Sequence, residues 1–189
     1  MTGLLVIGDS ISIGWTPPLR HELADRAEIV HNPGNGGDSS NLSAHLDDWL
    51  AEARPDLVLL NCGLHDLKRE RGAAGHQVPL DRYRENLARI FRTLRAAGCP
   101  VVWITTTPVI DERHRARKPF DRREADVAEY NAAALAVADE FYAGVIDLHA
   151  AAVEFGPEAA LGADGVHFTD DACQELGRFI AAELREHLK

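Results

Sequence analysis

Three residues in two separate segments are of the types that perform nucleophilic catalysis. Ser10 lies in "VIGDSISIG", where an apolar run ends at Gly8 and a helix is expected to begin. Much later in the chain, "ADGVHFTDD" places Asp164 and His167 three residues apart. A serine hydroxyl needs a base that takes its proton and a group that orients this base. In a turn, Asp164 can accept the ring Nδ1–H of His167 while Nε2 faces outward.

Each segment also has a plain structural interpretation. Serine is a common cap of helix N-termini, and surface turns often contain both aspartate and histidine. A third segment, "NCGLHDLK" at residues 61–68, follows an apolar run and places His65 beside Asp66. Four interpretations of that pair are open: a metal ligand set, a proton relay, a hydrogen-bond donor or plain loop. Taken singly, the segments leave these interpretations open.

The pattern of the intervening chain predicts how these segments are positioned. Short runs rich in Val, Ile and Leu, typical of strands buried on both faces, recur at Leu4–Ile7, Ala27–Val30, Leu57–Leu60, Val101–Thr105 and Gly144–Ile146. Helical patterns are found at Leu80–Ala97, Arg123–Phe141 and Asp170–Leu188. Strands that alternate with helices predict a parallel sheet in a three-layer α/β/α sandwich. With no repeat or linker, we expect one domain over residues 1–189.

Polar, glycine-bearing segments fall at the expected carboxyl ends of these strands. They are Gly8–Ser10 after the first strand, Gly34–Asp38 after the second, Gly63–Asp66 after the third, and Asp164–His167 before the last helix. Ligands of open parallel sheets bind beyond this edge. The convergence of the segments is more informative than any one of them, and it predicts a functional site there.

Composition argues against several classes of function. The net charge of −10 disfavours nucleic acid or an anionic membrane as a partner for the whole surface. No apolar stretch approaches the roughly 18 to 20 residues of a membrane span. Cys62, Cys99 and Cys173 are widely spaced and form no CxxC pair, so neither a disulfide framework nor a structural zinc site is expected. The N-terminal "MTGLLVIGDS" lacks the features of a signal peptide, and we expect a cytoplasmic location.

Four blocks of the chain, in order, resemble the SGNH/GDSL hydrolases. They are "GDS" after the first strand, "NPGNGGDSS" after the second, "GLHD" after the third and "DGVH" near the end. The segments "RPDLVLLNCG", "TTTPV" and "EYNAAL" also occur often in this family, so the resemblance covers nearly the whole chain. It implies a flavodoxin-like fold with strand order 2-1-3-4-5. It also implies hydrolysis of esters or related acyl compounds, with no metal or other cofactor.

The resemblance assigns roles to individual residues. Ser10 is the nucleophile, His167 the general base and Asp164 its orienter. The backbone amides of Ser10 and Gly37 donate to the oxyanion. The third donor is usually an asparagine, whereas this chain has His65 at that position. We expect His65 to donate instead, because neutral imidazole carries one N–H. A substrate-binding role for His65, or weakened catalysis, are the alternatives.

A two-metal phosphoesterase is the sharpest alternative for the same segments. Asp9, His65, Asp66, Asp164 and His167 are all of ligand type. Such sites usually also need an early DxH and a late HxH, and the chain has neither motif. We therefore expect no metal site.

Three residues near the blocks are candidates for substrate binding: Asp9, Trp15 and Asp66. Trp15 either lines the acyl pocket or packs against the first helix, and Asp66 is placed to anchor its loop. Two long connections, 68–77 and 111–124, leave the same edge of the sheet. The second is rich in Arg and Lys over residues 113–123, and it either attracts an anionic substrate or is a solvated loop with balanced charges.

The sequence thus predicts a serine esterase that works through an acyl-enzyme. Its partner is expected to be a small-molecule ester with a small or short acyl group, such as acetyl on a carbohydrate or lipid. A non-catalytic or weakly active binding protein with the SGNH fold is the alternative. The presence of Ser10, Asp164 and His167 together argues against it, because a binding protein has no need of all three.

Overall fold

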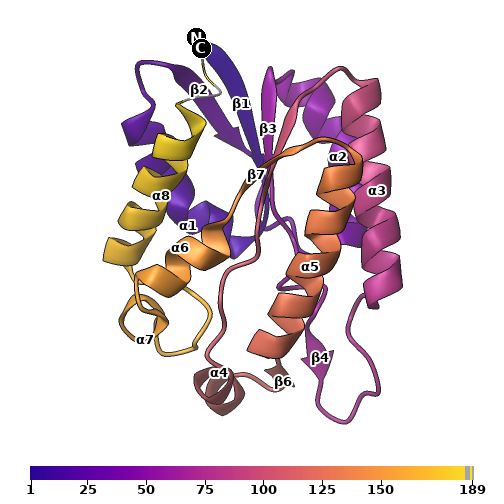
Figure 1. The fold of residues 1–189 in the computed structure, drawn as a ribbon, viewed down its shortest axis with the longest axis vertical. Helices are drawn as coiled ribbons and strands as arrows, with labels where there is room; N and C mark the ends of the chain where they lie inside the picture. Colours follow the sequence, from indigo (N-terminus) through magenta and orange to yellow (C-terminus); the bar gives the residue numbers. More distant parts are fainter. Residues whose placement is uncertain (186–187, 189) are drawn as a thin grey trace.

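The centre of the protein is a parallel sheet of five strands (Figure 1), in a computed structural model that describes residues 1–185 and 188. The strands lie in the order β2-β1-β3-β5-β7. Their bounds are β1 Thr2–Ile7, β2 Ala27–His31, β3 Leu57–Leu60, β5 Val101–Ile104 and β7 Gly144–Ile146. Counted among the central strands alone, this is the order 2-1-3-4-5, so the predicted α/β fold and its topology are confirmed.

Helices cover both faces of the sheet, which is why its strands are apolar throughout. The helices are α1 Ser10–Glu22, α2 Ser39–Ala53, α3 Leu80–Ala96, α4 Asp111–Arg117, α5 Glu124–Glu140, α6 Leu148–Glu154, α7 Pro157–Ala160 and α8 Asp170–Leu184. In Figure 1, α1, α6 and α8 lie on one side of the sheet and α2, α3 and α5 on the other. All four side chains of β3 are buried as a result. No helix of the described residues is long and apolar enough to cross a bilayer.

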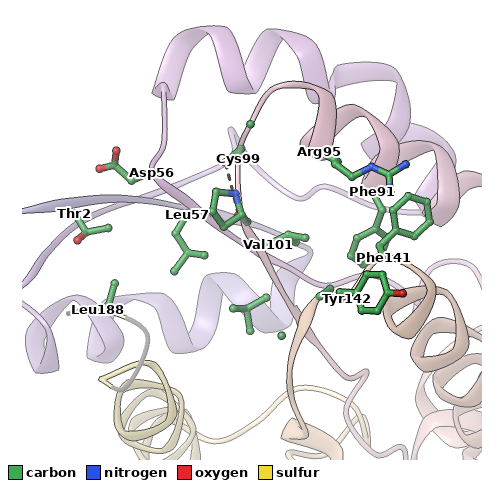
Figure 2. Close-up of a pocket in the computed structure, with 15 residues that line it drawn as sticks. Thr2, Asp56, Leu57, Phe91, Arg95, Cys99, Val101, Phe141, Tyr142 and Leu188 are labelled. Carbon is green, nitrogen blue, oxygen red and sulfur yellow. Dashed lines mark hydrogen bonds between the residues drawn. The ribbon is translucent and has the colours of Figure 1, made fainter.

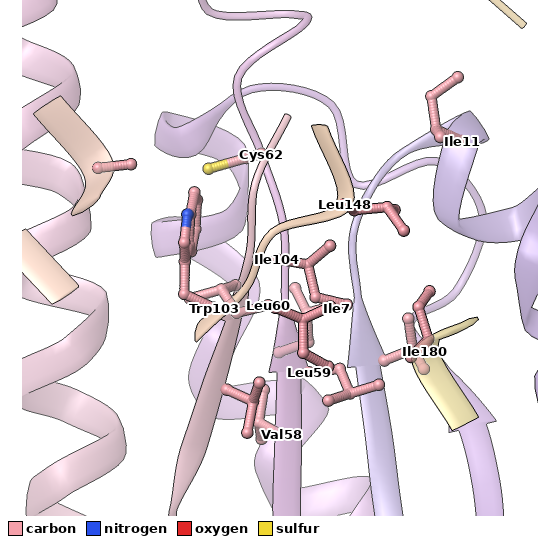
Figure 3. Close-up of a cluster of buried hydrophobic side chains, with 14 of the residues drawn as sticks. Ile7, Ile11, Val58, Leu59, Leu60, Cys62, Trp103, Ile104, Leu148 and Ile180 are labelled. Atoms are coloured by element: carbon pink, nitrogen blue, oxygen red, sulfur yellow. The ribbon is translucent and has the colours of Figure 1, made fainter. Parts of the chain in front are cut away.

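The hydrophobic core holds the central strands in position. Figure 3 shows Ile7, Leu59, Leu60 and Trp103 packed around the central strands, with Ile180 of α8 beside them. These side chains are at most 2% exposed. Each contributes about 1.5–3 kcal/mol through burial of its apolar surface. The carboxyl ends of β1 and β3, which lead into the first and third blocks, are therefore held firmly in register.

The two long connections that leave the carboxyl edge pair with one another. β4, Arg69–Glu70, forms a two-stranded antiparallel ribbon with β6, Phe120–Asp121. Arg71 extends this link, because its guanidinium donates to the carbonyl oxygens of Arg115 and Lys118, at 2.5 and 2.7 Å. The ribbon and α4 lie at the end of the molecule opposite the N-terminus (Figure 1).

The pattern-based bounds of the long helices agree with the structure to within a few residues. The last predicted helix ends at Leu184 rather than Leu188, and part of the interval lies outside the described residues. The pattern did not reveal α4, α6, α7 or the ribbon. Helices of 4 to 7 residues are too short to show an apolar period, and a two-residue strand shows no alternation.

Candidate active site

Ser10, His167 and Asp164 form a continuous hydrogen-bonded relay. Ser10 Oγ lies 2.9 Å from His167 Nε2, and His167 Nδ1 lies 2.6 Å from Asp164 Oδ2. Because a carboxylate accepts the proton on Nδ1, Nε2 carries the lone pair and accepts the serine hydroxyl. The geometry suits transfer of the serine proton to histidine during attack on a carbonyl carbon.

The turn that carries the base is held by its own aspartate and by α4. Asp164 Oδ1 accepts the backbone amides of Val166 and His167, at 3.1 and 3.0 Å. Gly165 has φ +68°, and a Cβ there would lie 2.6 Å from the carbonyl oxygen of Ile110 just before α4, so only glycine fits. Burial raises the pKa of Asp164, but the hydrogen bonds from His167 and Val166 outweigh it and hold this pKa well below its usual range. The carboxylate therefore stays ionised beside the base.

Ser10, the predicted nucleophile, is the first residue of α1, at the carboxyl end of β1. Asp9 caps this helix, because its Oδ1 accepts the amide of Ile11 at 2.9 Å. Gly8 leaves room for the turn, since a Cβ there would lie 2.5 Å from Ser12 Oγ. The amide of Ser10 is one of the free donors of a helix N-terminus, which favours negative charge nearby. It has no acceptor among the described residues.

Gly37 lies in the loop after β2 and has φ +70°, a conformation that favours glycine. Its amide donates to Asn35 Oδ1 at 2.9 Å. The predicted oxyanion donor thus has an internal acceptor in this structure. Asn35 is exposed, so a substrate oxyanion can take the place of its side chain.

His65 follows β3 and is half-buried. Burial lowers its pKa, the Asp9 and Asp38 carboxylates raise it, and the Arg122 and Lys68 cations lower it further. His65 is therefore neutral near pH 7 and carries a single N–H. No hydrogen bond to another described residue fixes which ring nitrogen holds the proton.

Asp66 joins the loops that carry Gly37 and His65. Its side chain is fully buried and accepts the amide and the hydroxyl of Ser39, the first residue of α2. Asn86 of α3 donates to the same hydroxyl at 2.9 Å. Burial raises the pKa of Asp66 to about 7, although the hydrogen bonds from Ser39 oppose the rise. The second and third blocks are consequently tied together beneath the surface.

Comparison with known proteins settles the family. Residues 6–174 match the GDSL-like lipase/acylhydrolase family. The chain belongs to this family. A comparison with curated protein sequences gave no significant match.

Solved structures of similar fold cover almost the whole chain of this GDSL-like lipase/acylhydrolase. A lipase/acylhydrolase from Enterococcus faecalis has 21% identity and a TM-score of 0.84, over 100% of this chain and 98% of its own. An acetylxylan esterase from Geobacillus stearothermophilus has 20% identity and a TM-score of 0.75, over 98% and 93%. A psychrotrophic esterase from Pseudoalteromonas sp. has 15% identity and a TM-score of 0.76, over 98% and 97%. The protein is an ester-hydrolysing enzyme with the SGNH fold.

Three expected substrate-binding residues of this acylhydrolase have structural positions instead. Trp15 is 1% exposed and belongs to the hydrophobic core, on the buried face of α1. Asp9 is equally buried and caps that helix, and Asp66 bonds Ser39. None of the three side chains reaches the surface where a substrate would lie, so direct contact with substrate is not supported. Asp38 caps α2.

Structural use of Asp9 and Asp66 also bears on the metal-site alternative. Asp9 accepts a backbone amide of α1 and Asp66 accepts one of α2, so the two carboxylates do not face a common centre. Within residues 1–185 and 188, no three His, Cys, Asp or Glu side chains gather as ligands of one metal ion.

Two cationic residues that sequence reasoning did not assign to the site lie against it. Lys118 Nζ is 3.5 Å from Asp164 Oδ2, and Arg122 Nε donates to the carbonyl oxygen of Leu64 at 2.6 Å. Both belong to the basic 113–123 segment, so the sequence signal was present. The β4–β6 ribbon, which no sequence pattern predicts, brings the segment that carries these two cations against the site.

A hollow of about 880 Å³ lies away from this site, at the opposite end of the sheet. Figure 2 shows Phe91, Phe141 and Tyr142 along one side of it and Cys99 and Leu57 along another. It contains no residue of the four family blocks, and the chemistry described above does not use it.

Proposed function

We propose that this GDSL-like acylhydrolase is a serine esterase that cleaves small or short-chain acyl esters through an acyl-enzyme. One observation carries the proposal: the unbroken relay from Ser10 Oγ to His167 at 2.9 Å and from His167 to Asp164 at 2.6 Å. A relay of this kind gives a serine the base and the orienting group that it needs.

The reaction follows from these contacts. Ser10 Oγ attacks the ester carbonyl carbon while His167 Nε2 takes the hydroxyl proton, and Asp164 stabilises the imidazolium. The amides of Ser10 and Gly37 and the ring N–H of His65 donate to the tetrahedral oxyanion. Collapse breaks the bond to the alcohol, which leaves with the proton from His167. Water then attacks the acyl-enzyme by the same steps in reverse order and releases the acid.

Two observations support a small acyl group. The His167 side chain is 46% exposed, so the reacting atoms lie at an open edge rather than at the end of a deep tunnel. The similar structures include an acetylxylan esterase. An acetyl ester of a carbohydrate or a short-chain lipid ester fits this arrangement.

The proposal is tested by turnover and by covalent labelling. We expect hydrolysis of p-nitrophenyl acetate and butyrate, and slower hydrolysis of longer chains. A fluorophosphonate should label the wild type at one serine. Ser10→Ala should lose the label and at least about 10³-fold in kcat. Ser43→Ala, a serine of α2 outside the relay, is the matched control and should keep both.

The alternative is an SGNH-fold binding protein with little or no activity. The internal bond from Gly37 to Asn35 and the histidine in place of asparagine favour it. Absence of label and of turnover on acetate, butyrate and acetylated sugars would establish this alternative. Activity that survives Ser10→Ala would overturn the proposed mechanism.

A further inference from the structure

Arg122 is a buried cation with most of its donors unused. It directly follows β6 and is 7% exposed. Its Nε donates to the carbonyl oxygen of Leu64, and its guanidinium carbon lies 5.1 Å from the centre of the Phe120 ring. A guanidinium carries five N–H groups, so the bond to Leu64 leaves four of them on the two terminal nitrogens.

Those terminal nitrogens have no acceptor among the described residues. The ion pairs of the structure include Lys118 with Asp164, but none joins Arg122 to a described carboxylate. A charged group that is nine-tenths buried normally has all its donors satisfied. Neither terminal nitrogen is among the fully enclosed atoms that lack a partner, so solvent reaches both. A solute therefore can reach them as well.

The guanidinium lies next to the third block of the candidate active site. Leu64 directly precedes His65, and the charge of Arg122 acts on the pKa of His65. Burial lowers the pKa of Arg122 itself, and the carboxylates of Asp9 and Asp164 raise it. Arginine stays charged throughout. Arg122 thus contacts the third block and lies within electrostatic range of the Asp164 carboxylate.

Two further cations adjoin this position. Lys68 Nζ lies 4.4 Å from the centre of the same Phe120 ring, and Lys118 Nζ lies 3.5 Å from Asp164 Oδ2. Lys68 is ion-paired with Glu70 at 2.6 Å, and Lys118 with Asp164. Of these three cations, only Arg122 has no carboxylate partner among the described residues.

We propose that Arg122 binds an oxyanion group of the substrate, a carboxylate or a phosphate carried by the acyl or the alcohol part of the ester. The inference rests on the proposed ester hydrolysis and narrows its substrate class to anionic esters. The planar fork of the guanidinium matches the two oxygens of such a group, and a partly desolvated site strengthens the bond.

A matched pair of substrates tests the proposal. 4-Nitrophenyl butyrate and 4-nitrophenyl hydrogen succinate both have a four-carbon acyl chain, which ends in a methyl group in one and a carboxylate in the other. We expect wild type to prefer the succinate ester in kcat/KM. Arg122→Met should lower the succinate-to-butyrate ratio at least tenfold, mainly through KM. Arg122→Lys, which keeps the charge but loses the fork, should lower it less.

Arg117→Met is the control, because Arg117 is an exposed cation of α4 whose loss changes net charge equally. It should leave the ratio unchanged. Succinate and inorganic phosphate, added as inhibitors of butyrate hydrolysis, distinguish a carboxylate from a phosphate as the preferred group. Their inhibition should weaken in Arg122→Lys, which gives a readout if Arg122→Met does not fold.

Several results would overturn the inference without touching the proposed esterase activity. They are an unchanged ratio in Arg122→Met, an equal loss of both substrates, or no competition by either anion in wild type. An equal loss would show that Arg122 only supports the Leu64 turn. A wild type that hydrolyses neither ester would instead contradict the proposed function.

Discussion

Lys118 Nζ and His167 Nδ1 approach the same oxygen of Asp164, at 3.5 and 2.6 Å from Oδ2. The aspartate of the relay is thus shared between His167, the proposed general base, and a lysine from the end of α4. A cation in this position opposes formation of the imidazolium through charge repulsion. It also competes for the carboxylate that would stabilise the imidazolium.

Lys118→Met should therefore raise kcat for ester hydrolysis, because the Asp164 carboxylate then stabilises the imidazolium of His167 alone. Lys118 is partly solvated, so the expected gain is about fivefold or less. Lys118→Arg should restore the wild-type kcat. An unchanged kcat in Lys118→Met would show that the lysine has no electrostatic effect on the base.

The His65 series measures whether imidazole replaces the usual amide donor. Because His65 is neutral near pH 7, it offers one N–H to the oxyanion. His65→Asn should keep kcat within about tenfold, whereas His65→Ala should lower it by about 10²–10³. His65→Gln tests the reach of the donor and should fall between them. Undiminished turnover in His65→Ala would exclude a donor role.

Asn35 is predicted to restrain the oxyanion site. Its Oδ1 accepts the Gly37 amide, so this bond must break before the amide can serve the transition state. Asn35→Ala should leave kcat unchanged or raise it by a few-fold, since a neutral hydrogen bond is worth about 0.5–1.5 kcal/mol. Asn35→Asp should lower kcat, because a carboxylate holds the amide more tightly and repels the oxyanion. A large fall in Asn35→Ala would instead make Asn35 part of the catalytic machinery.

The buried Asp66 should leave a signature in stability. Its pKa is about 7 in the folded protein and near 3.9 in an unfolded chain. Between these values the folded state retains a proton that the unfolded state releases. This contribution to stability therefore falls as pH rises from about 4 to 7, by at most about 1.4 kcal/mol per unit.

Urea unfolding of wild type and Asp66→Asn at pH 5, 6, 7 and 8 checks this sign. The free energy of unfolding of the variant, relative to wild type, should increase with pH up to about 7 and then level off. Asp48→Asn, an exposed carboxylate of α2, is the control and should show no such trend. A relative stability that stays constant from pH 5 to 8 would mean that the Ser39 bonds keep Asp66 ionised throughout.

Sequence patterns predicted the sheet, the long helices and the segments that meet at its carboxyl edge. They succeed where a signal is local: four consecutive buried residues in β3, or an aspartate three residues before a histidine. Trp15 shows the limit, since both expected positions, core and acyl pocket, suit an apolar residue of α1. The structure places Trp15 in the core. This burial depends on the contact of α1 with α8, which lies at the other end of the sequence.

Lys118 and Arg122 show this limit of prediction from sequence patterns more clearly. Lys118 and Arg122 belong to a segment whose composition predicts only positive charge. Their direction depends on the pairing of Arg69–Glu70 with Phe120–Asp121, two residues against two, about fifty positions apart. The hydrogen-bonded pair Asp164–His167 was predictable because its members are close in sequence. Lys118 contacts the same aspartate but lies far from it in the sequence, so no local sequence pattern predicts this contact.

That ribbon constrains how this protein can change over evolutionary time. Loops at a catalytic edge usually vary independently, and each can lengthen or shorten without regard to the next. Here the connection after β3 and the connection after β5 share a ladder, and Arg71 binds the second from the first. An insertion in one would displace Arg122 and Lys118 from the other. The two connections should accordingly be inherited, and exchanged between relatives, as a single unit.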